Sequence, residues 1–162
     1  MKEKSKVAVF MLIWAAALVI FPALALAGEE DTKIFLDKLR ADKKLLVATN
    51  MQLTESEAKD FWPVYARYQD ELFLLRTRTA NLIVEYANAY ENMTEDTAKK
   101  LMEEYMNIEA LGPKLRQAYL DEFRKVLPEM KVVRYYQIEN KIQAALMNAL
   151  AENIPLMKSG PK

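Results

Sequence analysis

The 162-residue chain contains neither cysteine nor histidine. Without cysteine the chain can form no disulfide, carry no thiol nucleophile and attach no lipid to a cysteine behind a leader peptide. Without histidine, Cys/His zinc sites, Ser-His-Asp triads and imidazole acid–base chemistry are excluded as well. An enzyme would have to work with carboxylates, Lys, Tyr, Ser and Thr. A carboxylate-based hydrolase stays open as an alternative, but we expect that the protein is not an enzyme and that it uses no cofactor and no metal.

Glycine is also scarce, with three residues in the whole chain. A many-stranded sheet needs a tight turn about every 8–12 residues, so this composition argues against one. The chain is nevertheless 52% hydrophobic and 28% charged, which is too apolar for intrinsic disorder. The sequence therefore predicts an ordered, all-α protein whose length fits one domain.

The first 27 residues have the three parts of a secretory signal peptide. Three lysines within residues 2–6 form a basic start, residues 7–21 form an apolar run without charge, and residues 25–27 read Ala-Leu-Ala. An uncleaved membrane anchor is the alternative, but a bilayer span takes about 20 apolar residues. We expect cleavage after Ala27, export of the protein and no integral membrane segment in the mature chain.

The charge of the expected mature chain limits its partners. Removal of the leader takes away three lysines and one glutamate, which leaves 20 basic and 22 acidic residues and a formal charge of −2. No overall basic field remains to attract nucleic acid or an anionic membrane, so we expect no nucleic-acid partner. Without disulfides the fold depends on core packing alone, for which a chain of this length suffices.

Four segments show helical periodicity: about 32–49, 54–91, 94–126 and 128–154. Thr54 and Glu57 predict a capping box at the start of the second segment. Thr94 is a suitable N-cap for the third segment, and Pro128 suits the first position of the fourth. We predict a single all-helical domain over residues 28–157, followed by a polar tail at 158–162.

The second segment carries a long apolar seam, in which positions alternate four and three residues apart. The seam positions are Phe61, Tyr65, Tyr68, Leu72, Leu75, Thr79, Leu82, Tyr86 and Ala89. The third segment has a similar seam that includes Tyr105, so we predict a long antiparallel hairpin of these two helices. Pro63 and Pro113 lie inside them, where we expect kinks and not ends. Because two shorter helices cannot cover a hairpin about 55 Å long, we also predict a homodimer.

Three clusters invite a functional interpretation, and each also has a structural one. The aromatic residues near Trp62 could grip unfolded partners. The seam members among them fit a core better, whereas Trp62 lies off the seam and fits an exposed or an interface position equally well. Met102 and Met106 are one helical turn apart and could ligate Cu(I), although flexible core filling is the better interpretation. Glu103 and its acidic neighbours fit a solvated face better than the catalytic dyad of a hydrolase.

Residues 127–142 form the segment with the most specific side-chain pattern in the chain. On a helix Gln137 and Lys141 lie one turn apart, as do Tyr135 and Glu139, and Glu139 faces the seam side. A carboxylate near the core needs a partner, for which an Arg or Lys from a neighbouring helix is the natural choice. A structural network that fixes helix register is favoured over a binding role.

Residues 53–57 read Leu-Thr-Glu-Ser-Glu at the start of the long helix. With the leader, the absence of cysteine and the four helices, this segment resembles the Spy/CpxP group of periplasmic proteins, which carry two Leu-Thr-x-x-Gln motifs at helix starts. Glu replaces Gln in the first motif. The second motif would be residues 127–131, Leu-Pro-Glu-Met-Lys, where both the Thr and the Gln are replaced. The motif residues transferred by this resemblance are Leu53, Thr54, Glu57, Leu127 and Pro128.

The resemblance implies a cradle-shaped homodimer that acts as an ATP-independent chaperone, an envelope-stress adaptor or a metal-responsive sensor. Metal-responsive members use His or Cys ligands, which this chain lacks. We therefore expect a periplasmic binding protein for unfolded clients or for an envelope sensor protein. The alternative is a structural or regulatory envelope protein that recognises one dedicated folded partner. Helix phase suggests the contact residues Trp62, Arg76, Arg78, Arg116 and Arg124.

Overall fold

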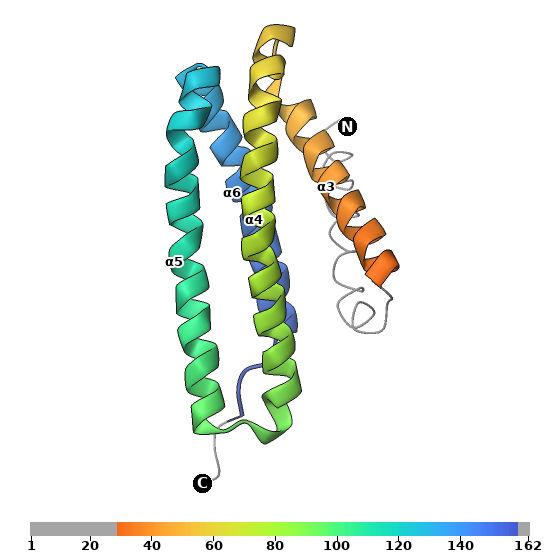
Figure 1. Ribbon diagram of the computed structural model, residues 1–162, viewed down its shortest axis with the longest axis vertical. Coiled ribbons are helices and arrows are strands. Elements are labelled where there is room, and N and C mark those ends of the chain that lie inside the picture. Colours follow the sequence, from red (N-terminus) through yellow and green to blue (C-terminus); the bar gives the residue numbers. More distant parts are fainter. Residues whose placement is uncertain (1–28, 159–162) are drawn as a thin grey trace. The chain divides into compact units, whose positions relative to one another are not determined.

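The structure is a computed structural model that describes residues 29–158 (Figure 1). This part of the chain contains helices and no strand, so the all-α prediction with four helices is confirmed. The helices are α3 (Glu29–Met51), α4 (Glu55–Ala89), α5 (Glu95–Val126) and α6 (Glu129–Asn153), with the short 3-10 helix η1 (Tyr90–Asn92) between α4 and α5. The expected signal peptide and the residues after Lys158 lie outside the described part.

Local sequence signals explain the helix boundaries. Thr94 caps α5, because its hydroxyl oxygen accepts a hydrogen bond from the Thr97 amide at 3.2 Å. Both long helices continue through their prolines, Pro63 and Pro113, as predicted. Gln52 follows the end of α3 with a φ of 51°, the left-handed conformation that ends many helices.

The described residues divide into two compact units. The first unit contains residues 29–52 and 134–154, and the second contains residues 53–133 and 155–158. The start of α6 therefore belongs to the second unit and the rest of α6 to the first. The expectation of one domain over residues 28–157 stays a prediction.

The core of the second unit is aromatic. Phe61 and Phe123 are both fully buried, with ring centroids 5.7 Å apart, and Tyr68 lies 5.2 Å from Tyr119. Phe61, Tyr65 and Tyr68 are thus core residues, as the seam predicted. From Phe61 to Tyr68 the residue numbers rise along α4, whereas the numbers of their ring partners on α5, Phe123 and Tyr119, fall. The two helices lie side by side in Figure 1.

The Tyr119 hydroxyl in this core donates a hydrogen bond to Oε1 of Glu71 at 2.5 Å. Burial, followed by the bond to Glu71, raises the pKa of Tyr119 to about 12. The phenol therefore stays protonated at physiological pH and remains a donor to the carboxylate.

The seam prediction extends too far. Tyr105 is 49% exposed, and the α4 positions from Leu72 onward are half-buried and not part of the core. The assignment of Tyr105 to the seam is therefore wrong. Leu101, four residues before Tyr105, and Ile108, three residues after it, are both buried, so α5 keeps its buried face on both sides of this exposed ring.

The first unit has a smaller core with one charged member. Its buried apolar residues are Val47, Met51, Tyr135, Ile142 and Ala149. Glu139 lies among the buried residues at 7% exposure, and Lys43 on α3 donates to its Oε2 at 2.9 Å. The prediction that Glu139 needs a cationic partner from a neighbouring helix is confirmed.

The chain after α6 is hydrogen-bonded to the end of α4 within the second unit. The Tyr86 hydroxyl donates to the carbonyl oxygen of Pro155 at 2.8 Å, and the Tyr90 hydroxyl donates to that of Leu156 at 3.2 Å. Lys158 forms an ion pair with Glu91. The side chain of Leu156 is 90% exposed, so the hydroxyls hold this segment by its backbone.

The double variant Tyr86→Phe/Tyr90→Phe should release this segment while keeping both rings. We expect cleavage by chymotrypsin after Leu156 to become severalfold faster, because the segment opens more often. The helical circular dichroism should not change. The control is Tyr105→Phe, which removes a hydroxyl from an exposed ring elsewhere in the unit. Equal cleavage rates for the double variant and the control would contradict the prediction.

Candidate functional site

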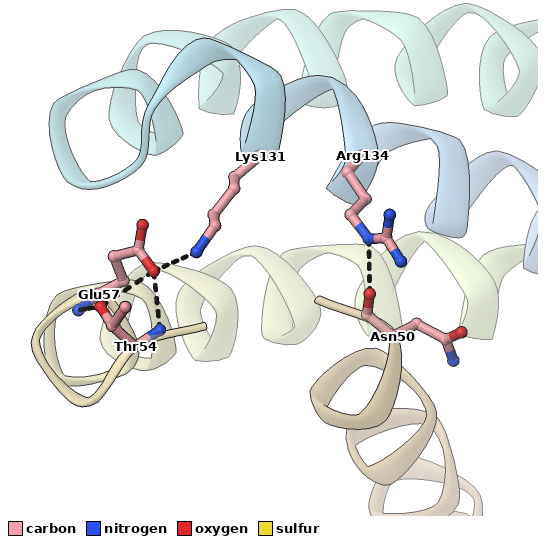
Figure 2. Close-up of polar contacts among 5 residues, drawn as sticks. All are labelled: Asn50, Thr54, Glu57, Lys131 and Arg134. Carbon is pink, nitrogen blue, oxygen red and sulfur yellow. Dashed lines mark hydrogen bonds and ion pairs between the residues drawn. The ribbon is translucent and has the colours of Figure 1, made fainter. Parts of the chain in front are cut away.

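The first motif forms a complete capping box at the start of α4. The Thr54 hydroxyl oxygen accepts a hydrogen bond from the Glu57 amide at 3.3 Å, and Oε2 of Glu57 accepts one from the Thr54 amide at 2.8 Å (Figure 2). The box satisfies two amides that have no partner inside the helix, and it places a carboxylate at the positive end of the helix dipole. The capping-box prediction is confirmed.

The second motif starts α6 in a related way but without a side-chain cap. Leu127 is buried, and its amide donates to the Phe123 carbonyl at 3.0 Å, which ends α5. The carbonyl of Pro128 then accepts from the amides of Lys131 and Val132 at 2.8 and 3.0 Å. The helix is assigned from Glu129, one residue later than predicted. Pro128 therefore stands where Thr54 stands in the first motif.

The side chains of Glu57 and Lys131 contact each other. Nζ of Lys131 forms a hydrogen bond and an ion pair with Oε2 of Glu57, and these side chains are 26% and 18% exposed (Figure 2). The hydrogen bond from Lys131, followed by the one from the Thr54 amide, lowers the pKa of Glu57 below its usual value. The two helix starts are thus joined by opposite charges, each three residues after the residue that precedes its helix. We call Thr54, Glu57 and Lys131 the paired helix starts.

Sequence reasoning recorded both departures from the Gln motif but missed that they complement each other. The signal available in the sequence was the opposite charge of the two side chains, since one of these positions carries an acid and the other a base.

Glu57→Gln removes the carboxylate charge and tests the paired helix starts. We expect a lower Tm at pH 7, because the ion pair and the stronger carboxylate cap are lost. A carboxylate with a lowered folded-state pKa stabilises the fold above its unfolded pKa, near 4.5, and this contribution disappears as the pH falls through the folded value. The difference in Tm between wild type and variant should therefore narrow in acid.

Glu55→Gln is the matched control, because Glu55 lies in the same first turn of α4 and is exposed. Thermal melts across the pH range should give a clearly smaller effect for this variant. Identical curves for the two variants would show that only the general charge of the helix start matters.

The contact residues suggested by helix phase occupy different environments. Trp62 is half-buried, with its ring 5.0 Å from Phe61 and 5.2 Å from Tyr65. Arg76 and Arg116 are also half-buried. Trp62 therefore joins the edge of the aromatic core and is not an isolated surface residue.

The other two predicted contact residues form ion pairs within the second unit. Arg78 donates two hydrogen bonds to the carboxylate of Glu104, from Nε at 3.0 Å and from Nη2 at 2.9 Å. Arg124 holds Glu129 in the same bidentate manner at 3.1 and 2.9 Å. Each arginine is thus committed to a different acidic partner, and these bonds do not gather the predicted residues into one cluster.

Exposed apolar side chains on α4 and α5 are the second set of candidate contacts. Its members are Leu74, Val84, Met102, Tyr105 and Met106, between 47% and 66% exposed. Sequence reasoning assigned Met102 and Met106 to core filling, which is wrong. The two methionines lie off the α5 face that contains the buried Leu101 and Ile108. We call these five residues the exposed apolar surface.

Within residues 29–158, no group of three or more acidic side chains is arranged to hold a metal ion. No helix in this part of the chain is long and apolar enough to span a membrane. Comparison with protein-family models, curated proteins and solved structures finds no match to the chain.

Proposed function

We propose that the protein is an exported, periplasmic helical binding protein of the Spy/CpxP type, which acts as an ATP-independent chaperone or as an envelope-stress adaptor. In this proposal α4 and α5 form the long antiparallel hairpin of a cradle-shaped homodimer. The protein is not an enzyme, and its partners are unfolded clients or an envelope sensor protein.

The exposed apolar surface is the observation that carries this proposal. Met102 and Met106 are 59% and 58% exposed, and unbranched thioether side chains adapt to partners of different shape. Exposed charges lie close by in the sequence of the same helix, among them Lys99 paired with Glu103. Apolar contacts between charged residues suit weak, exchangeable binding of unfolded segments, for which no nucleotide is needed.

The paired helix starts support the family part of the proposal. The two motif segments begin two helices of one compact unit, and they contact each other at the same motif position. The opposite charges at these two positions complement each other across the contact.

The test is light scattering of several unrelated unfolding proteins with and without the chain from residue 28 to 162, with molecular mass measured on the same samples. We expect suppressed aggregation near one homodimer per client, without ATP. Suppression of none of these clients by the well-folded protein would overturn the chaperone proposal and favour a dedicated folded partner.

The double variant Met102→Glu/Met106→Glu should abolish most of the suppression, because it places charge in the exposed apolar surface. The control Asn107→Glu/Gln117→Glu adds the same charge at exposed polar positions of α5. Equal activity of the two variants would exclude the exposed apolar surface as the client site.

A further inference from the structure

The first unit contains a pocket of about 240 Å³ between α3 and α6. It is lined by Leu46, Asn50, Arg134, Gln137, Ile138 and Lys141. Two of these side chains are cationic, two are amides and two are aliphatic, and none is acidic. The polar part of the pocket therefore offers hydrogen-bond donors backed by positive charge.

Arg134 is oriented by a contact that uses only part of its guanidinium group. Its Nε donates to the carbonyl oxygen of Asn50 at 2.6 Å (Figure 2). The Asn50 side chain is itself fixed, because Nδ2 donates to the Leu46 carbonyl at 2.8 Å. The two terminal Nη groups of Arg134 make no hydrogen bond to any residue in the described part of the chain. A fixed guanidinium with both Nη groups available suits bidentate binding of an oxyanion.

Lys141 supplies a second positive charge on the same face of α6. Residues 134, 137, 138 and 141 fall on one helical stripe by the 100° turn per residue. Lys141 forms neither an ion pair nor a hydrogen bond with any residue whose side chain the structure describes. The acid nearest to it on α6, Glu139, lies on the buried stripe and is held by Lys43. The charge of Lys141 is therefore not used in the fold.

We propose that this pocket binds a small oxyanion, a carboxylate or a phosphate group, carried on a short apolar body. Arg134 receives two oxygen atoms of the anion, Lys141 supplies the second positive charge, and Gln137 donates from its amide. Leu46 and Ile138 contact the apolar part. Pockets for drug-sized ligands measure about 300–1,000 Å³, so the smaller volume here selects a compact ligand. This site lies in the first unit and does not depend on the proposed function of the second.

The experiment is a titration of the isotope-labelled protein, followed by amide NMR shifts, with sodium acetate, butanoate, inorganic phosphate and chloride at equal ionic strength. Acetate or phosphate should shift the amides of the lining residues in a saturable manner, and chloride should not. Comparison of acetate with phosphate identifies which oxyanion the pocket prefers. Butanoate should bind more tightly than acetate, by about two- to fourfold for each methylene buried against Leu46 and Ile138.

Lys141→Gln is the decisive variant, because this side chain has no role in the fold. We expect a severalfold weaker affinity for the anion with unchanged thermal stability. Lys114→Gln removes an exposed lysine of α5 in the second unit and should leave the affinity unchanged. Arg134→Lys keeps the charge but removes the two Nη donors of the planar guanidinium group, and should also weaken binding.

Two results would overturn the proposal. One is that chloride produces the same shifts as acetate and phosphate. The other is that Lys141→Gln binds the anion as tightly as the wild type, which would mean that Arg134 serves only to cap the end of α3.

Discussion

Replacing Phe123 with alanine is expected to lower the free energy of unfolding by about 3–5 kcal/mol. Phe123 is fully buried, and its ring centroid lies 5.7 Å from that of Phe61, 5.8 Å from that of Tyr68 and 6.3 Å from that of Tyr119. The substitution removes the ring where three other aromatic side chains converge from α4 and α5. Because these neighbours are large and tightly placed, the resulting cavity cannot close without disrupting the remaining ring contacts.

Tyr105→Ala is the matched control for this variant, because it removes an aromatic ring from the same helix at a position that is 49% exposed. Urea or thermal unfolding of both variants should give a far smaller loss for Tyr105→Ala, within about 1 kcal/mol. Similar losses for the two variants would contradict the location of the core at the Phe123 end of α5.

Replacing Lys43 with methionine should cost about 2–4 kcal/mol, because it removes the Lys43 salt bridge from the buried carboxylate of Glu139. The pair is 2.9 Å long, and the side chains of Lys43 and Glu139 are 20% and 8% exposed. The partial exposure of Lys43 places the expected loss below the upper range for fully buried pairs. Chemical denaturation at neutral pH measures this loss directly.

The double variant Lys43→Met/Glu139→Leu should recover most of this stability. A buried ion pair replaced by apolar side chains of similar volume often leaves stability unchanged, whereas removal of one partner does not. If the double variant is as unstable as Lys43→Met, the loss would come from packing around Lys43 and not from the charge left on Glu139.

Sequence reasoning reached the fold class because its signals are local. Capping residues such as Thr54 and Thr94 act within one turn, and the periodicity of Phe61, Tyr65 and Tyr68 identifies a buried face without reference to any partner. The need of Glu139 for a cation was also predictable, because a carboxylate on a buried face is costly without one.

The candidate binding surfaces were harder to predict from the sequence, for physical reasons. The exposure of Tyr105, between the buried Leu101 and Ile108, depends on what packs beside α5, which the spacing of apolar residues does not specify. The bond between Glu57 and Lys131 joins residues 74 positions apart. The stripe of Gln137 and Lys141 was visible in the sequence, but the orientation of Arg134 depends on the end of α3.

The central claim is that the exposed apolar surface of α4 and α5 binds unfolded clients. Photo-crosslinking tests it most directly, with a photoreactive residue placed at position 74, 106 or, as a control, 117. The account predicts adducts with several unrelated unfolded proteins from positions 74 and 106 and few from position 117. Equal yields from all three positions, or adducts with a single folded partner alone, would contradict it.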